Sequence, residues 1–355
     1  MAKKISVALL FGGRSAEHEV SIRSAEAVHR NLDPEKYEVS SLYINKRGEW
    51  KNAASPFRPM QELGQGPFHS FLPWANRRPA EPVQTDIYFP VLHGPYGEDG
   101  TIQGLLEMAD VPYVGAAVLA SAVGMDKAVM KILFRAKNLP VARFIVLHEP
   151  EWIARPGVVL KRVRREFSLP FFVKPANLGS SVGITKVKNY ADAEAALKTA
   201  FIYDRKILVE EGIAGREIEC SVLGNDEPRA SLPGEIMPSR EFYDYDDKYL
   251  DGKTEFGIPA RLPALIVKRI QRLAIEAFKA CDCSGMARVD FFLQARPPRI
   301  LLSEINTIPG FTEISMYPKL WEVSGLRFPQ LVDRLIELGL ERHRTKKRCV
   351  DRGRT

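Results

Sequence analysis

Two short segments near the carboxyl end, Arg288-Val289-Asp290 and Leu302-Ser303-Glu304-Ile305-Asn306-Thr307-Ile308-Pro309-Gly310, have the mixed apolar and polar spacing of β-strands. Side chains two residues apart on a strand share a face, so Arg288 is expected beside Asp290 and Glu304 beside Asn306. If the two strands are neighbours, one surface carries a cation, two carboxylates and an amide. Such oxygen ligands suit Mg²⁺ held against substrate phosphates. The plainer alternative is a salt-bridged sheet surface that binds no ligand.

The composition is that of an ordinary globular protein, with 45% hydrophobic and 27% charged residues. A chain of 355 residues predicts two or three domains. The net charge is +7, but residues 341–355 hold seven Lys or Arg and two acidic residues and so supply +5 of it. The remaining body is close to neutral, which argues against nucleic acid as a partner. The basic tail, residues 342–355, is expected to be a disordered, solvated terminus.

The four cysteines show no CxxC pair, which favours free thiols in a reducing compartment over a zinc site or disulfides. The apolar run Ile5–Phe11 is too short for a signal peptide or a membrane span. We therefore expect a cytoplasmic protein that does not bind a membrane.

The amino-terminal segment begins like a buried parallel strand. Its apolar run ends at Gly12-Gly13 and leads into a helix. Glycines at a first strand-to-helix turn are also found in dinucleotide-binding proteins, but the GxGxxG spacing is absent. The alternative is that this turn places Glu17 over the carboxyl ends of the strands, where open α/β sheets bind ligands. His93 follows another apolar run, Ile87–Leu92, and is either a structural hydrogen-bonding residue or a binding residue.

A second glycine-rich segment, Ala176–Gly183, lies between the expected strands Phe171–Pro175 and Ile184–Val187. Its backbone N–H groups and hydroxyls suit phosphate oxygens. The Walker pattern is absent, and glycine is also common in simple hairpin connections, so both interpretations stay open at this point. Residues 242–254 mix aromatic, acidic and lysine residues without a period, which predicts a long loop of the kind that covers binding sites.

These segments together resemble the D-alanine–D-alanine ligases of the ATP-grasp superfamily. The resemblance runs from Ile5 to about Leu340, except for residues 45–85. It rests on seven motifs that occur in this order: GGRSAEHEVS, HGPYGEDG, MDK, FVKPANLGSSVG, YDYDDKY, GMARVDFF and EINTIPGFTEISMYPKL.

The resemblance implies the ATP-grasp fold, of class α/β and α+β. Residues 1–121 would form a Rossmann-like α/β domain that binds the amino acid. Residues 122–212 and 213–341 would form two α+β domains that clasp ATP between them.

The resemblance also implies the residues of an ATP site. Lysines that contact the phosphates would be Lys127 and Lys174, and Lys248 would reach the transferred phosphoryl group. The loop with Gly179, Ser180 and Ser181 would close over the phosphates. Glu210 and the backbone near Ile213 would contact adenine, and Glu217 would hold the ribose. The Mg²⁺ ligands would be Asp290, Glu304 and Asn306; two ions are expected, and Mn²⁺ is expected to substitute.

The implied reaction joins two molecules of D-alanine for peptidoglycan precursor synthesis. Glu17 would pair with the ammonium group of the first D-alanine, whose carboxylate becomes an acyl phosphate, and His93 would also contact substrate. Arg288 and the Gly310 N–H would stabilise the oxyanion that forms when the second amine attacks. Ser315 and the Met316 backbone would bind the second carboxylate. Glu17, Ser180 and Tyr249 would form one hydrogen-bonded set, and Tyr249 favours a dipeptide product over D-alanyl-D-lactate.

Other functions are compatible with part of these motifs. Another ATP-grasp carboxylate–amine ligase, including a D-alanine–D-lactate ligase, would share the nucleotide residues and metal ligands. A non-catalytic nucleotide- or nucleic-acid-binding module and a dehydrogenase fit less of the chain. The resemblance further implies a homodimer.

Overall fold

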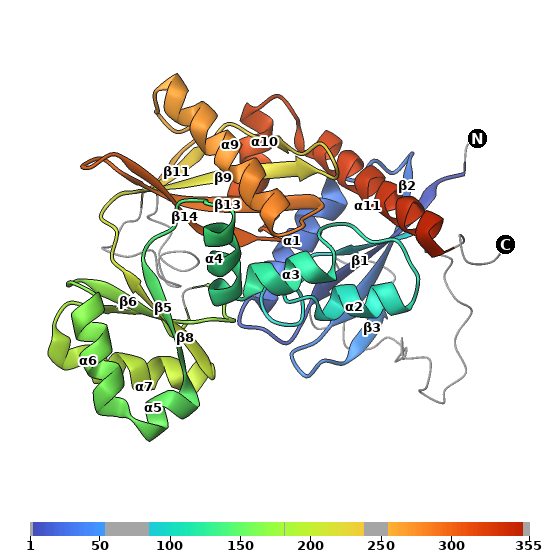
Figure 1. The fold of residues 1–355 in the computed structure, drawn as a ribbon. Helices are drawn as coiled ribbons and strands as arrows, with labels where there is room; N and C mark the ends of the chain where they lie inside the picture. Colours follow the sequence, from blue (N-terminus) through green and yellow to red (C-terminus); the bar gives the residue numbers. More distant parts are fainter. Residues whose placement is uncertain (1–2, 54–84, 181, 238–254, 351–355) are drawn as a thin grey trace.

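The computed structural model describes residues 3–53, 85–180, 182–237 and 255–350, the side chains of residues 52–53 and 347–350 excepted. The described part of the chain contains three separate β-sheets with helices on their faces (Figure 1). The first sheet comes from the amino-terminal third of the chain, and the other two follow it in chain order. This arrangement matches the predicted combination of an α/β unit with two α+β units.

The first sheet has the strand order β3-β2-β1-β4. Strand β1 (Ile5–Gly12) lies parallel to β2 (Tyr37–Ile44) and β4 (Ile87–Pro90). Because β1 is central and covered on both faces, its apolar run is continuous and its side chains are buried. Helices α1 (His18–Arg30) and α2 (Thr101–Met108) belong to the same unit. Strand β3 (Trp50–Ala53), antiparallel to β2, was not predicted, because four residues are too few to show a period.

The second sheet has the order β5-β8-β6-β7 and is antiparallel throughout. Its strands are β5 (Phe144–His148), β6 (Phe171–Pro175), β7 (Thr185–Val187) and β8 (Lys206–Glu211). Helices α5 (Glu149–Ala154), α6 (Pro156–Glu166) and α7 (Ala193–Tyr203), with the 3₁₀ turn Tyr190–Asp192, pack beside it (Figure 1). Phe171 and Val173 belong to this helix-covered core, so the alternate residue Lys174 is on the opposite face.

The third sheet has the order β12-β11-β9-β13-β14, and β10 pairs with β9. The strands are β9 (Arg216–Gly224), β10 (Arg229–Ala230), β11 (Gly234–Met237), β12 (Glu255–Gly257), β13 (Gly285–Gln294) and β14 (Arg299–Asn306). Strands β13 and β14 are antiparallel neighbours, with Arg288 opposite Asn306 and Asp290 opposite Glu304. The two segments are therefore adjacent strands, which is the condition for the expected polar surface.

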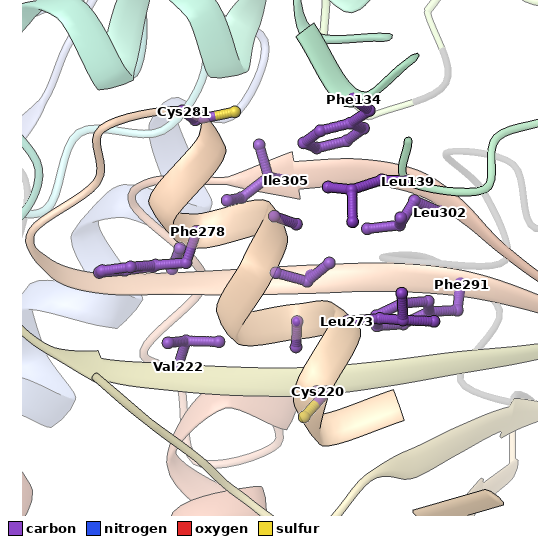
Figure 2. Close-up of a cluster of buried hydrophobic side chains, with 14 of the residues drawn as sticks. Phe134, Leu139, Cys220, Val222, Leu273, Phe278, Cys281, Phe291, Leu302 and Ile305 are labelled. Atoms are coloured by element: carbon purple, nitrogen blue, oxygen red, sulfur yellow. The ribbon is translucent and has the colours of Figure 1, made fainter. Parts of the chain in front are cut away.

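Helix α9 (Ala264–Ala280) covers one face of the third sheet. Figure 2 shows Leu273 and Phe278 of this helix among side chains of the strands, including Phe291. Phe134 joins the same cluster from helix α4 (Lys127–Ala136). Burying each such side chain stabilises the fold by about 1.5–3 kcal/mol, so this face is fixed as the interior. The polar residues that alternate with these apolar residues along the strands consequently lie on the other face of the sheet.

Two pairs of helices pack against sheets that are formed by other parts of the chain. Helices α3 (Val118–Met125) and α4 pack against the third sheet. Helices α10 (Met316–Val323) and α11 (Phe328–Val350) share a core with the first sheet, where Leu331 and Leu335 are in one cluster with β1 and β4. The predicted limit at residue 122 falls inside α3, whereas that at residue 212 falls between β8 and β9. The domain limits stay a prediction.

The carboxyl-terminal segment differs from expectation. Helix α11 continues to Val350, so the prediction of a disordered tail is wrong for residues 342–350; residues 351–355 lie outside the described residues. Arg342 explains the difference, because its guanidinium lies 4.2 Å from the Tyr113 ring centre and donates to the carbonyl oxygens of Tyr113 (2.9 Å) and Gly115. The Arg342 side chain therefore donates hydrogen bonds to buried carbonyl oxygens and is not directed only toward solvent.

Cys220, Cys281 and Cys283 are buried free thiols, as their spacing predicts. Among the helices that the structure describes, none has the length and hydropathy needed to cross a bilayer.

Candidate functional site

Elements of the three units line a cavity of about 450 Å³. Its walls come from α1 and the turn before it, the loops after β4 and β6, and the segment from β14 to α10. A smaller cavity of about 100 Å³ has walls from the second and third sheets. Both are lined by Lys127, Gly179, Ser180, Glu219, Arg288 and Glu304. Ligands in the two cavities would therefore meet at these residues.

The open face of the third sheet carries a row of three carboxylates. Register places Asp290 of β13 between Glu219 of β9 and Glu304 of β14. Like charges on adjacent strands repel one another, so this row needs cations. Arg288 supplies one: its Nε and Nη2 donate to the two Asp290 oxygens at 2.8 and 2.7 Å, and Nε lies 3.1 Å from Glu219. Burial alone would lower the pKa of Arg288, but the charges of Asp290 and Glu219 raise it, which keeps the guanidinium charged.

The three predicted Mg²⁺ ligands lie together on this face. Asp290 is opposite Glu304, and the Asn306 amide nitrogen donates to Asp290 over 3.0 Å. Two carboxylates and an amide suit Mg²⁺, which usually keeps waters and phosphate oxygens as its other ligands. Within the described residues, no three His, Cys, Asp or Glu side chains are grouped so that they alone could hold a metal ion. The donor set fits the metal, and its binding stays a prediction.

A buried ion cluster lies behind the smaller cavity. The carboxylate of Glu210 pairs with Lys131 and with Lys174, each at 2.5 Å. Burial alone would raise the pKa of Glu210, but the two lysines lower it to about 2. Lys174 lines the smaller cavity, and the carboxylate that orients it is thus held as an anion at neutral pH.

The predicted nucleotide residues fall into three groups. Glu217 lines the smaller cavity with Lys174, and Lys127 lies 3.8 Å from Glu304 while donating to the Leu178 carbonyl at 2.6 Å. Glu210 and Ile213, predicted to contact adenine, are not among the described residues that line either cavity, and both Glu210 oxygens face lysines. Ser181 and Lys248 lie outside the described residues.

The amino-terminal unit contributes Glu17, which lies in the turn before α1. Ser180 of the loop after β6 donates to Glu17 over 2.5 Å, so the predicted contact between them is present. Ser180 has φ of 49°, a left-handed conformation that is uncommon for residues other than glycine, Asn and Asp. Gly94 faces Glu17 with φ of 77°, and a Cβ there would lie 2.8 Å from the carboxylate. Tyr249, the third member of the predicted set, lies outside the described residues.

His93 borders the larger cavity but is only 4% exposed. Its Nε2 lies 2.9 Å from the Ser24 hydroxyl, and its Nδ1 lies 3.1 Å from the Ile308 carbonyl oxygen. Burial alone would lower the pKa of His93, but Glu98, whose oxygen is 3.6 Å from Nδ1, raises it. Both ring nitrogens are thus engaged by the protein, and the geometry supports a structural role more than the predicted substrate contact.

The segment after β14 brings Gly310, Ser315 and Met316 to the same cavity. A Cβ on Gly310 would lie 2.7 Å from the Ser315 hydroxyl, so only glycine leaves this backbone accessible. The Ser315 hydroxyl accepts the Thr312 N–H at 3.0 Å and precedes the first turn of α10. The N-terminus of a helix favours a carboxylate, because its first N–H groups have no partner within the helix.

Three residues of the site were not predicted. Glu219 is two residues after Glu217 on β9, and that alternation was the available signal. Lys131 is four residues after Lys127 on α4, so it shares its face. Glu98 lies in the same loop as His93, and no sequence pattern of its own marked it as a site residue.

Comparisons with known proteins agree on one family. The family model for the D-ala D-ala ligase N-terminus matches residues 6–116, and that for the D-ala D-ala ligase C-terminus matches residues 133–337. The D-alanine–D-alanine ligase of Solibacter usitatus is 51% identical over 344 residues, which cover 97% of this chain and 98% of that protein.

Solved structures give the same result. The D-alanine–D-alanine ligase of Coxiella burnetii superimposes with a TM-score of 0.87 at 40% identity, covering 99% of this chain and 98% of the other. The VanG D-Ala:D-Ser ligase of Enterococcus faecalis has a TM-score of 0.81 at 34% identity, covering 95% and 100%.

Proposed function

Because this chain belongs to the D-alanine–D-alanine ligase family and has its ATP-grasp fold, we propose that it joins two D-alanine molecules through a D-alanyl phosphate intermediate. The enzyme is an ATP-dependent, ADP-forming ligase. The product serves peptidoglycan precursor synthesis.

One observation carries the proposal: Arg288, Lys127, Glu304 and Ser180 line both cavities. A carboxylate in the larger cavity and a phosphate chain in the smaller one would meet there. Activating a carboxylate with ATP requires this proximity, because the carboxylate oxygen must reach the γ-phosphorus.

In the first half-reaction, Glu17 accepts hydrogen bonds from the ammonium group of the first D-alanine. This contact orients the carboxylate of the first D-alanine toward Arg288. Lys127 and Lys174 hold phosphate oxygens as point charges, and the loop with Gly179 and Ser180 lies over them. The carboxylate oxygen then bonds to the γ-phosphorus, and the bond to the ADP oxygen breaks.

In the second half-reaction, Ser315 and the Met316 N–H bind the carboxylate of the second D-alanine. Its free amine attacks the acyl phosphate carbon. The developing oxyanion receives hydrogen bonds from Arg288 and the Gly310 N–H, donors that the fold has placed before the reaction begins. The tetrahedral intermediate then collapses to the dipeptide: the carbon–oxygen bond to phosphate breaks, and the nitrogen releases a proton to the departing phosphate or to solvent.

Asp290, Glu304 and Asn306 would hold Mg²⁺, which neutralises charge on the phosphate oxygens when bound. Arg288 already pairs with both oxygens of Asp290, so this side chain also orients a metal ligand.

Several further features belong to the proposal. Lys248 and Tyr249 act from the segment at residues 242–254. Glu217 holds the ribose. The domains have limits near residues 122 and 212. The protein functions as a homodimer in the cytoplasm, the compartment that supplies its ATP.

The test is phosphate release from ATP and Mg²⁺ with D-alanine, with L-alanine, or with D-alanine plus D-lactate, the products being identified by mass. We expect release with D-alanine alone, yielding D-alanyl-D-alanine. Release that requires D-lactate would indicate a D-alanine–D-lactate ligase. An absence of turnover with all three would contradict the proposed substrates.

A further inference from the structure

The segment Ile308–Phe311, which contains the Gly310 amide, is held at both ends by residues of the amino-terminal unit. At one end the Ile308 carbonyl oxygen lies 3.1 Å from His93 Nδ1. At the other end the Phe311 N–H donates to the Ser24 hydroxyl oxygen over 3.3 Å. Ser24 and His93 are themselves joined, with Oγ 2.9 Å from Nε2. These four residues are between 0% and 4% exposed, so water does not compete for these hydrogen bonds.

The direction of each hydrogen bond follows from its partners. A carbonyl oxygen only accepts, so His93 Nδ1 carries a proton and donates to Ile308. In the neutral imidazole, Nε2 is then an acceptor and receives the Ser24 hydroxyl proton. The Ser24 oxygen in turn accepts the Phe311 N–H. These hydrogen bonds link Ile308, His93, Ser24 and Phe311 in one chain.

The same network reaches the turn that carries Glu17. The Ser15 hydroxyl donates to the His93 carbonyl oxygen over 2.7 Å, and the Glu17 N–H donates to the Ser15 hydroxyl over 3.2 Å. One set of hydrogen bonds thus joins the turn that carries Glu17 to the turn that carries Gly310.

We propose that Ser24, acting with His93, is a positioning residue for the condensation step: it sets the position of the Gly310 N–H relative to the carbon attacked by the second amine. This rests on the proposed function, because it assumes that the Gly310 N–H binds the oxyanion. Ser24 is fully buried and is not among the residues that line either cavity, so we expect its effect on the second half-reaction and not on the first.

Apolar packing confines the effect of removing the Ser24 hydroxyl to the segment Ile308–Phe311. The Phe311 ring lies near the rings of Phe89 (6.0 Å), Tyr317 (5.4 Å) and Phe328 (6.1 Å), and it is fully buried. These apolar contacts remain when the Ser24 hydroxyl is removed. The segment therefore stays docked, while the position of its peptide groups is no longer fixed by hydrogen bonds.

Helix α1 offers a matched control in Ser21. Its side chain is as buried as that of Ser24 and makes two backbone hydrogen bonds, accepting from Gly12 N–H at 2.8 Å and donating to Val91 O at 2.5 Å. Gly12 is the last residue of β1 and Val91 is the first residue after β4, so neither partner lies in the segment that carries Gly310. Ser21→Ala should thus reduce stability without changing the position of Gly310.

The experiment is a single-turnover reaction with enzyme in excess over labelled ATP and with saturating D-alanine, stopped by rapid quenching. The rate constants of ATP loss and of dipeptide formation are measured separately for the wild type, Ser24→Ala, Ser24→Cys and Ser21→Ala. Ser24→Cys preserves most of the side-chain volume with a weaker hydrogen bond, so it remains informative if Ser24→Ala folds poorly.

We expect Ser24→Ala and Ser24→Cys to leave ATP loss within about twofold of the wild type and to slow dipeptide formation about tenfold, less than the loss of a whole oxyanion donor. Ser21→Ala should keep the wild-type ratio of the two rate constants. Equal slowing of both steps in the Ser24 variants, or an unchanged ratio, would overturn the inference. An inert wild type would instead refute the proposed function.

Discussion

Replacing Glu210 with glutamine is expected to destabilise the protein by about 3 kcal/mol at pH 7. Glu210 is 1% exposed and separates two lysines, Lys131 and Lys174, each 2.5 Å from one of its oxygens. Burial alone would raise its pKa, but the lysines lower it from 4.5 to about 2. Each unit of pKa shift corresponds to about 1.36 kcal/mol, so a shift from 4.5 to about 2 corresponds to about 3 kcal/mol. Removing one partner of a buried ion pair costs a similar amount, about 3–5 kcal/mol.

The sign of the pH dependence follows from the lowered pKa. A carboxylate whose pKa is lower in the folded state stabilises the fold fully above the unfolded pKa of 4.5 and loses this contribution as the pH falls toward 2. The difference in the free energy of unfolding between the wild type and Glu210→Gln should therefore be constant from about pH 5.5 to 7.5. It should become smaller only in more acidic solution.

The assay is urea unfolding followed by tryptophan fluorescence, since Trp152 is buried in the core of the second sheet. Glu211→Gln is the matched control, because Glu211 is the next residue and makes longer, more exposed ion pairs with Arg143 (3.7 Å) and Arg299 (3.4 Å). It should cost about 0–1 kcal/mol. The reasoning is refuted if Glu210→Gln is no more destabilising than the control, or if the difference already shrinks between pH 7.5 and 5.5.

Three further outcomes are expected. Arg342→Ala should lower stability by about 2–3 kcal/mol in thermal unfolding, because it leaves buried carbonyl groups unpaired; the exposed Arg344→Ala should change little, and equal effects would contradict this. Ser315→Ala should raise the KM for the second D-alanine about tenfold with a smaller effect on kcat, measured in the phosphate-release assay; an unchanged KM would argue against carboxylate binding there. Asp290→Asn should raise the Mg²⁺ concentration needed for half-maximal phosphate release by about tenfold or more, and an unaltered Mg²⁺ titration would remove this residue from the metal site.

Much of the sheet structure could be predicted from local patterns. The ranges of β1, β6 and β7 agree with the expected strands to within one residue, because a buried strand leaves a short apolar or alternating run. Both β13 and β14 were expected as strands, whereas their pairing was only a condition of the expected polar surface and is given by the structure. The helical tail was missed because basic residues dominate its composition, whereas Arg342 is held by acceptors near Tyr113.

The candidate site divides in the same way. The sequence alone determined which segments form strands and which carry the carboxylates, lysines and glycines, because periodicity and residue chemistry are local properties. Only the tertiary structure decided that Glu219 pairs with Arg288, that Glu210 lies between two lysines, and that Ser24 holds a segment 287 residues away. Such contacts depend on how three sheets pack together, and burial then gives each ion pair and hydrogen bond a strength that no local pattern specifies.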